Sequence, residues 1–247
     1  MSSSLLIPNW PAPANVKAAV STRLGGYSEG CYASLNVGDH VGDNEQHVLQ
    51  NRACFWQVAQ MPAEPVWLQQ VHGTRVLTLN RANHNSHHGQ QADGSITTDS
   101  GVVCTVMTAD CLPLLLCDSA GRQVAAVHAG WRGLCDGIIE QAVAQFANTA
   151  EVLAYLGPAI SQSAFEVGPE VRAAFISSAA EAEQAFVPGA AGKWQADLYL
   201  LARQRLQAAG VFQIYGGDYC TYAQQELFFS YRRDGKTGRM AASIWLD

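Results

Sequence analysis

Three short apolar segments near the middle of the chain restrict its fold more than any other feature. They read GVVCTVMT (residues 101–108), LPLLLCD (112–118) and QVAAVHAG (123–130). Each is too short to cross a bilayer as a helix, and apolar runs of this length between short turns are typical of buried strands. We therefore interpret them as consecutive strands of a buried sheet.

The composition is that of an ordinary globular protein. The 247 residues are enough to bury a sizeable core, and a net charge of −6 offers no basic surface to nucleic acid or to an anionic membrane. The first residues lack the charged and apolar regions of a signal peptide, and no run is long enough to span a bilayer. These features predict a cytoplasmic protein whose seven cysteines, none in a CxxC pair, are free thiols.

The order of predicted elements indicates the fold class. From hydrophobic periodicity and turn residues we predict further strands at residues 16–23, 65–73, 75–80, 152–159, 212–217, 226–231 and 239–246, and helices at residues 45–60, 133–147, 169–179 and 196–209. Strands outnumber helices and do not alternate with them regularly, and the chain has no repeat and no long linker. We therefore expect one α+β domain spanning residues 1–247.

Two histidine- or serine-containing loops are weak candidates for sites. The segment GYSEG matches the serine hydrolase pattern around Ser28, but that mechanism needs a helix directly after the serine, and a loop is predicted there. We interpret it as a glycine-rich turn whose N–H groups could line a pocket. His84, His87 and His88 lie in a polar loop where no rigid element would fix metal geometry. No Walker A, GxGxxG or zinc-deaminase signature is present.

The strongest candidates are His72, Cys111 and His128. Each lies at or near a strand end and is followed within two residues by Gly or Pro, so the three side chains could converge at one rim of a sheet. Two imidazoles and a thiolate suit zinc and would leave its fourth position open, which is the catalytic arrangement. Spacing alone leaves two alternatives, a Cys–His nucleophile or plain buried residues.

Separate blocks along nearly the whole chain carry a resemblance to a known family. They are STRLGGYSEG, SLNVGDHVGD, WLQQVHG, ADGSITT, TADCLPLLLCD, VAAVHAGWRGL, YLGPAI, FEVGPEV and FFSYRRDGKTGRMAASIWL. In this order they resemble the YfiH family, also called the multicopper polyphenol oxidoreductase or laccase-domain family. The resemblance implies a metal bound by His72, Cys111 and His128. It also implies layered mixed sheets flanked by helices, a four-layer sandwich shared with a bacterial toxin deamidase that uses a Cys–His pair.

The same resemblance implies a zinc-dependent purine nucleoside phosphorylase that also deaminates adenosine. The older family name suggests copper oxidation of phenols instead, but several coppers need many histidines, and this chain has seven in total with three in the polar loop. A related family name, peptidoglycan editing factor, suggests hydrolysis of cell-wall precursors. A binding module built around a closed, structural zinc is the non-enzymatic alternative.

Phosphorolysis also requires a cationic group that holds phosphate near the metal. Arg132, at the start of the helix after the His128 block, is the first candidate from the sequence, and Arg23, Arg232 and Arg233 are weaker ones. Asp110 is the nearest candidate for carrying a proton or orienting a ligand. The predicted small-molecule partners are therefore a purine nucleoside and phosphate.

Overall fold

The three central apolar segments form strands of two stacked sheets in the computed structural model, which describes residues 4–247. β5 (Val103–Thr108) belongs to one sheet, and β6 (Leu112–Asp118) and β7 (Val124–Ala129) belong to the other. The predicted strands are confirmed, but the chain crosses between sheets after β5. Asp110 lies at this crossing with a φ of 97°, a value that few non-glycine residues adopt.

The larger sheet has six strands and is mostly antiparallel. In spatial order it contains β12 (Gln213–Gly216), β8 (Val152–Leu156), β6, β7, β4 (Gly94–Thr97) and β3 (Val76–Leu79). Only the pairs β12–β8 and β3–β4 are parallel. Every residue of β6 and β7 is buried, which explains why their sequences are continuous apolar runs without alternation.

In the smaller sheet, a strand from the beginning of the chain pairs with the last strand. This sheet contains, in order, β1 (Leu5–Leu6), β2 (Val16–Ser21), β13 (Met240–Leu246) and β5, all antiparallel. β13 is the central strand of this sheet together with β2, and all of its residues are buried. The C-terminal segment therefore lies directly beside the strand that leads to Cys111.

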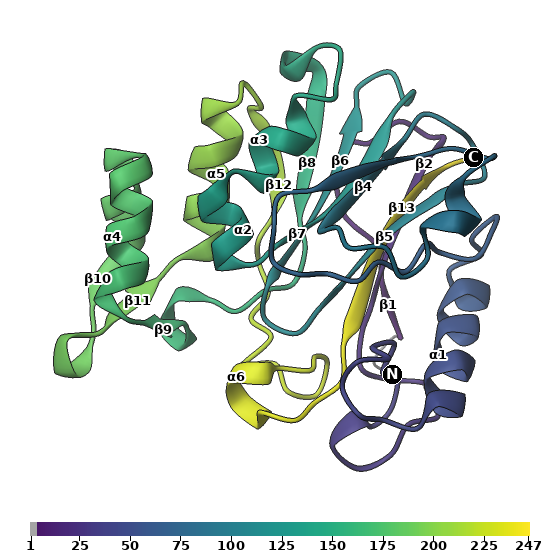
Figure 1. Ribbon diagram of the computed structural model, residues 1–247, viewed down its shortest axis with the longest axis horizontal. Helices are drawn as coiled ribbons and strands as arrows, with labels where there is room; N and C mark the ends of the chain where they lie inside the picture. The colour runs from purple at the N-terminus through teal and green to yellow at the C-terminus, as the bar shows by residue number, and fades with distance from the viewer. Residues whose placement is uncertain (1–3) are drawn as a thin grey trace.

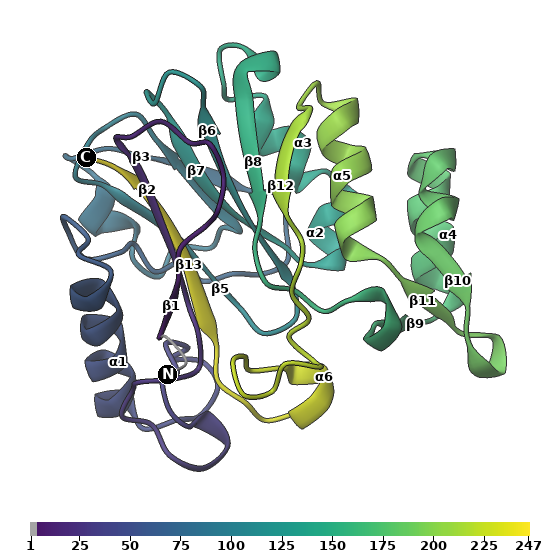
Figure 2. The ribbon, with the colours of Figure 1, turned by 180° about the vertical axis from the view of Figure 1, so that it is seen from behind.

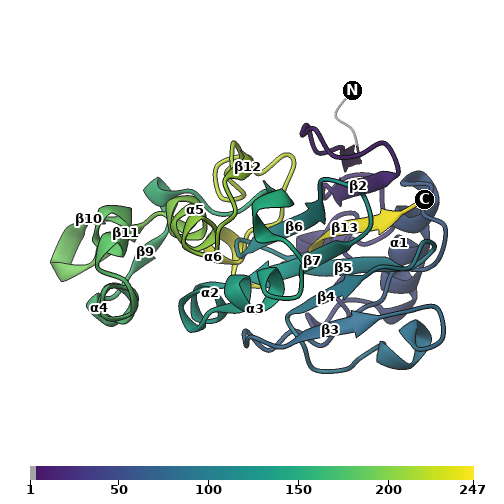
Figure 3. The same ribbon diagram turned by 90° about the horizontal axis from the view of Figure 1, so that it is seen from above.

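Helices cover the outer faces of both sheets, which gives four layers (Figures 1 and 3). α1 (Glu45–Val58) packs through Phe55 on the smaller sheet. α2 (Trp131–Asp136), α3 (Ile138–Val143) and α5 (Leu198–Ala208) cover the larger sheet. Side chains of β2, β5 and β13 meet those of β6, β7 and β8 between the sheets. The predicted α+β class and the four-layer sandwich are thus confirmed.

A smaller unit extends from the larger sheet at the end opposite α1 (Figure 2). It consists of α4 (Pro169–Ser178) and a three-stranded sheet of β10 (Phe186–Pro188), β11 (Trp194–Ala196) and β9 (Glu166–Val167). α6 (Tyr231–Asp234), which precedes β13 in the chain, lies between this unit and β13 in Figure 2. Within residues 4–247 no helix is long and apolar enough to cross a bilayer.

Two predicted strands are wrong. Residues 65–73 form only the isolated bridges of Val66 with Cys104 and of Gln69 with Gln91, because the N–H groups at the end of this segment bind a carboxylate instead of a neighbouring strand. Residues 226 and 227 end a turn, residues 228–230 are irregular, and Tyr231 already begins α6. Their apolar character reflects two fully buried phenylalanines at positions 228 and 229, not strand pairing.

Other predicted boundaries differ from the structure. The helix expected at residues 133–147 begins at Trp131, breaks at Gly137 and ends at Val143. The short strands β1, β4, β9, β10 and β11 were not predicted, because runs of two to four residues are too brief to show periodicity. The helices expected at residues 45–60, 169–179 and 196–209 are confirmed as α1, α4 and α5.

Gly137 gives a direct test of the break between α2 and α3. Its φ of 98° lies in the left-handed region, and a Cβ there would have Glu140 Oε2 as its nearest neighbour at 3.6 Å, so a substitution strains the backbone without a clash. We expect Gly137→Ala to lower the free energy of unfolding by roughly 1–2 kcal/mol, and Gly137→Asn to lower it less. Urea unfolding measures both. An alanine variant as stable as the parent protein would contradict this explanation of the break.

Candidate metal centre

The structure brings His72, Cys111 and His128 together. One ligand atom of each lies within 4.8 Å of those of the other two, and Cys111 Sγ is 3.8 Å from His72 Nε2. The two imidazole rings meet edge to face with their centroids 4.8 Å apart. The predicted convergence at one rim of the larger sheet is therefore present, and the role of these side chains as metal ligands stays a prediction.

Three different segments supply these side chains. His128 is next to last in β7, and its antiparallel pairing partner in β6 is Pro113, two positions after Cys111. His72 comes from the irregular segment before β3 and has a φ of 61°. Both His72 and Asp110 thus have unfavourable left-handed backbones, a form of strain that often accompanies functional sites.

A buried carboxylate, Asp93, orients two of the three candidate ligands. Its side chain accepts a hydrogen bond from His128 Nδ1 at 2.8 Å. It also accepts bonds from the backbone N–H groups of Val71, His72 and Gly73 at 3.2, 2.8 and 2.7 Å. Because Asp93 occupies Nδ1 of His128, the other ring nitrogen is left for Cys111 or a metal. Asp93 was not predicted from the sequence.

Glycines allow the closest contacts of the site. A Cβ on Gly130 would lie 2.6 Å from His72 Cδ2 and 3.2 Å from Cys111 Sγ. A Cβ on Gly133 would lie 2.6 Å from the carbonyl oxygen of Gly73. The glycines of the sequence HAGWRG are therefore required so that the start of α2 can lie against the His72 loop.

Without a metal, the site favours a thiolate beside an imidazolium. Burial opposes ionisation of Cys111, but the hydrogen bonds and positive charges of His128 and His72 lower its pKa to about 6. Burial likewise opposes protonation of His128, but Asp93 and Cys111 raise its pKa to about 9. By contrast, burial raises the pKa of Cys117 to about 12. Thiolate is the form of cysteine that binds metals, so Cys111 is prepared for a metal or for nucleophilic attack.

The donor set fits one zinc ion. For typical Zn–S and Zn–N bond lengths and a tetrahedral angle, sulfur and nitrogen ligands lie about 3.6 Å apart, close to the observed 3.8 Å between Cys111 and His72. Three ligands would leave the fourth position open. Within residues 4–247 this is the one group of three metal-binding side chains, which gives no second or third position for a multicopper centre.

Asp110 and Arg232 join the site to α6. Asp110 Oδ1 accepts a hydrogen bond from Thr221 Oγ1 at 2.6 Å, and its Oδ2 accepts one from the backbone N–H of Arg232 at 2.7 Å. The guanidinium of Arg232 donates to the carbonyl oxygen of Glu166 and lies over the ring of Phe165. The carboxylate that touches a candidate ligand is thus Asp93, whereas Asp110 fixes the loop beside Cys111.

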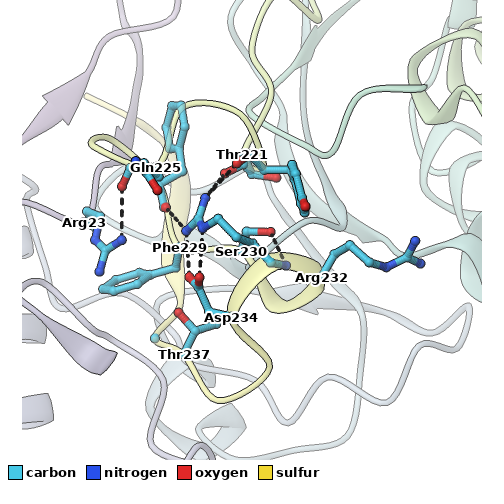
Figure 4. Close-up of polar contacts among 12 residues, drawn as sticks. Arg23, Thr221, Gln225, Phe229, Ser230, Arg232, Asp234 and Thr237 are labelled. Atoms are coloured by element: carbon cyan, nitrogen blue, oxygen red, sulfur yellow. Dashed lines mark hydrogen bonds and ion pairs between the residues drawn. The ribbon is translucent and has the colours of Figure 1, made fainter. Parts of the chain in front are cut away.

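Arg23 and Arg233 hold the loop before α6, and Figure 4 shows the contact of Arg23 with Gln225 of this loop. Arg23 donates to the carbonyl oxygens of Ala33 and Gln225 at 3.0 and 3.1 Å. Arg233 donates to carbonyl oxygens of three loop residues and pairs with Asp234. All three guanidinium nitrogens of Arg233 are therefore occupied by the protein itself, whereas Nη2 of Arg23 makes no hydrogen bond within residues 4–247.

Arg132 differs from these two arginines. It is exposed in the first turn of α2, where its guanidinium stacks on the ring of Trp131 at 4.4 Å. Its side chain makes no hydrogen bond or ion pair with residues 4–247. It remains available to a ligand, and within residues 4–247 its guanidinium is held only by the Trp131 ring.

The weaker candidates lie elsewhere. Ser28 donates to Asp43 at 2.6 Å and accepts from Asn51 at 2.8 Å, so its hydroxyl is held by a carboxylate and an amide and has no histidine base. His88 borders a cleft of about 920 Å³ between α1 and the segment before His72. None of the three candidate ligands lines this cleft, although Gln70 does. His84 and His87 lie outside it in a short 3₁₀ turn.

Comparison with known proteins places the chain in a family. Residues 17–247 match the family model described as multi-copper polyphenol oxidoreductase laccase. The chain belongs to this laccase-domain family. The chain is also 54% identical over 245 residues to proteins named purine nucleoside phosphorylase YfiH from Shigella flexneri and from Escherichia coli K12, covering 99% of each chain. The resemblance that the sequence blocks indicated is confirmed.

Solved structures of this laccase-domain family share the fold. A crystal structure of a Neisseria meningitidis protein is 50% identical, with a TM-score of 0.93 over 99% of this chain and 100% of that one. The YlmD protein of Geobacillus stearothermophilus is 29% identical, with a TM-score of 0.90 over 100% of this chain and 97% of that one. Both proteins thus share the four-layer arrangement of this chain.

Asp93 gives a test of how the ligands are positioned. Asp93→Asn removes the negative charge that holds His128 and the His72 loop, and we expect it to weaken zinc binding by roughly ten- to a hundredfold. Competition with a chromophoric chelator measures the affinity. Asp118→Asn is the matched control, because Asp118 is also a buried acid that accepts hydrogen bonds from a loop, at the far end of β6. Equal zinc affinity in the two variants would contradict the orienting role of Asp93.

Proposed function

We propose that this protein is a cytoplasmic, zinc-dependent purine nucleoside phosphorylase that also deaminates adenosine. One observation carries the proposal: two imidazoles and a thiolate converge at a sheet rim with a buried carboxylate behind them and an exposed side at His72. Relatives that are 54% identical and named purine nucleoside phosphorylase support the substrate class.

His72, Cys111 and His128 would hold the metal in this proposal. When bound, zinc would supply Lewis-acid chemistry and a water of lowered pKa at its open position. Asp93 would keep the His128 ring in one orientation, and the thiolate of Cys111 needs no further proton loss near neutral pH because its pKa is about 6. The side chains therefore require little rearrangement when they bind a metal.

The two proposed reactions make different demands on the protein. In phosphorolysis a phosphate oxygen bonds to the ribose C1′ while the bond from C1′ to the purine nitrogen breaks, and its electron pair leaves with the base. The site must hold an anion for this step. In deamination water adds at the purine C6 and ammonia leaves, so no phosphate is needed. Asp110 stays the candidate proton carrier, close to Cys111 in the chain.

A second candidate function rests on the metal-free geometry. Cys111, His128 and Asp93 form a line of thiolate, imidazolium and carboxylate, which is the arrangement of a Cys–His hydrolase. Such an enzyme could cleave an amide in a peptidoglycan precursor without zinc. The copper oxidase suggested by the family description is less well supported, because a single three-residue cluster is present within residues 4–247.

Metal analysis and product analysis distinguish these candidates. We expect about one zinc per chain after purification without added metal, and phosphate-dependent release of purine base and ribose 1-phosphate from nucleosides, since the ligand set is borderline soft and has an open position. Chelation should abolish turnover while the fold persists. Stoichiometric copper, or full activity without metal, would contradict the zinc proposal. Loss of the fold together with the metal would indicate a structural zinc module.

The cysteines give a further test of the metal assignment. Cys111→Ala should lose bound zinc and nearly all phosphorolysis, because it removes one of three ligands. Cys117→Ala is the control: Cys117 is fully buried in β6, with a pKa raised to about 12, and we expect the variant to lose stability but keep its zinc. Zinc analysis and thermal unfolding measure both. A Cys111→Ala protein with full zinc content would show that the assignment is wrong.

A further inference from the structure

Arg239 lies at the same rim as the candidate metal centre, although the sequence analysis did not name it as a site candidate. Met240, the first residue of β13, pairs with Thr108, the last residue of β5. Continuing this antiparallel register places Arg239 opposite Ala109, two positions before Cys111. The pairing of the C-terminal strand therefore delivers an arginine to the loop that carries a metal ligand.

The position of Arg239 is fixed before any ligand arrives. Its backbone N–H donates to Asn36 Oδ1 at 2.8 Å. Its aliphatic stem lies so close to Gly38 that a Cβ there would be 2.7 Å from Arg239 Cγ. Its Nη1 donates to the carbonyl oxygens of Thr237 and Gly238 at 3.1 and 3.0 Å. The guanidinium thus needs little ordering when it binds a partner.

Two nitrogens of this guanidinium remain available. Nε and Nη2 of Arg239 make no hydrogen bond within residues 4–247, and no carboxylate in that range lies within ion-pair distance. Neither nitrogen is among the fully buried atoms that lack a partner, so both can be reached from solvent. In Arg233, by contrast, all three guanidinium nitrogens donate to carbonyl oxygens or to Asp234. In Arg23 only Nη2 is left without a hydrogen bond within residues 4–247, so it cannot offer two donors side by side.

The negative charges that act on Arg239 include those of Cys111, a candidate metal ligand, and of its neighbour Asp110. Burial lowers the pKa of Arg239, and the negative charges of Cys111 and Asp110 act in the opposite direction. This agrees with the strand register, which places Arg239 opposite Ala109 and so beside the loop that carries Cys111. The oxygens of Asp110 accept hydrogen bonds from Thr221 and from the N–H of Arg232, so this carboxylate does not occupy the guanidinium.

We propose that Arg239 binds the phosphate co-substrate beside the metal, with Nε and Nη2 donating to two phosphate oxygens. The proposal rests on the phosphorylase function proposed above. A planar guanidinium matches two oxygens of a phosphate with parallel hydrogen bonds, which a point charge cannot do. Arg132, the first candidate from the sequence, is exposed and lacks such a fixed position. Arg239 is a substrate-binding residue in this scheme and transfers no proton.

Two variants of the zinc-loaded enzyme test this role. Arg239→Gln removes the charge but keeps an amide that can donate to the carbonyl oxygens of Thr237 and Gly238. Arg239→Lys keeps the charge without the planar pair of donors. Isothermal titration calorimetry with inorganic phosphate gives Kd, and inosine phosphorolysis gives the phosphate KM. We expect Arg239→Gln to raise both by roughly ten- to a hundredfold and Arg239→Lys to raise them less, with zinc content unchanged.

Arg203→Gln is the matched control. Arg203 is also partly buried, and among the described residues 4–247 its guanidinium also donates only to carbonyl oxygens, those of Ile214 and Gly216. We expect this variant to lose stability without a change in phosphate Kd. Thermal unfolding of all variants separates loss of structure from loss of the anion contact.

Three results would overturn the proposal: an unchanged phosphate Kd in Arg239→Gln, equal weakening by Gln and Lys in step with their loss of Tm, or an equal effect of Arg203→Gln. If Arg239→Gln does not fold, an unchanged Kd in Arg239→Lys has the same meaning. Failure of the phosphorylase function looks different, because the wild-type protein then leaves every nucleoside intact in the presence of phosphate. The phosphate Kd alone then decides the role of Arg239.

Discussion

The rest of the site depends on the hydrogen bonds that the buried carboxylate of Asp93 accepts. A buried charge is costly unless it is fully hydrogen-bonded, and this one accepts an imidazole N–H from His128 and three backbone N–H groups from the segment that carries His72. The pairing of β4 with β7 places Asp93 next to His128. The backbone N–H of His128 donates a hydrogen bond to the backbone carbonyl oxygen of Asp93, which shows this pairing. One side chain thus ties the end of β7 to the irregular loop that carries His72, while Gln70 of the same loop is held to the backbone of Met107 in β5.

The stacking of the two sheets supplies the third ligand and the nearby arginine. The chain leaves the smaller sheet at Thr108 and enters the larger one at Leu112, so Cys111 lies where the two layers meet. The left-handed backbone of Asp110 makes that crossing, and its carboxylate anchors α6 at the same place. Because β13 pairs with β5 up to the crossing, the residue that precedes β13 must lie at the same rim. The same order of strands therefore produces the four layers and brings Cys111 and Arg239 to one rim.

The sequence predicted the apolar strands, the principal helices and the three candidate ligands, because each leaves a signal in a continuous stretch of residues. It did not predict Asp93, since a lone acid before a four-residue strand looks like any loop residue until the pairing of β4 and β7 is known. Arg239 was missed for the same reason: its place beside Cys111 is set by strand register over more than a hundred residues of separation. The segment 65–73 was predicted as a strand from its apolar residues, yet the backbone N–H groups of its last three residues bind the Asp93 carboxylate. Contacts made through register and buried charge have no local pattern to find.

The protonation of the metal-free site relates its two possible chemistries. Near neutral pH His128 holds a proton, because Asp93 and the Cys111 thiolate raise its pKa to about 9 against the effect of burial. A metal that binds the free ring nitrogen has to displace that proton, so binding becomes easier as the pH rises toward 9 and harder as it falls. Protonation of the Cys111 thiolate, whose pKa is about 6, opposes metal binding only in more acidic solution. Asp93 therefore stabilises the imidazolium of a metal-free pair and, once the proton has left, orients the neutral imidazole of a metal ligand. The same three side chains suit a Cys–His pair or a zinc centre, and the proton on His128 is what separates the two states.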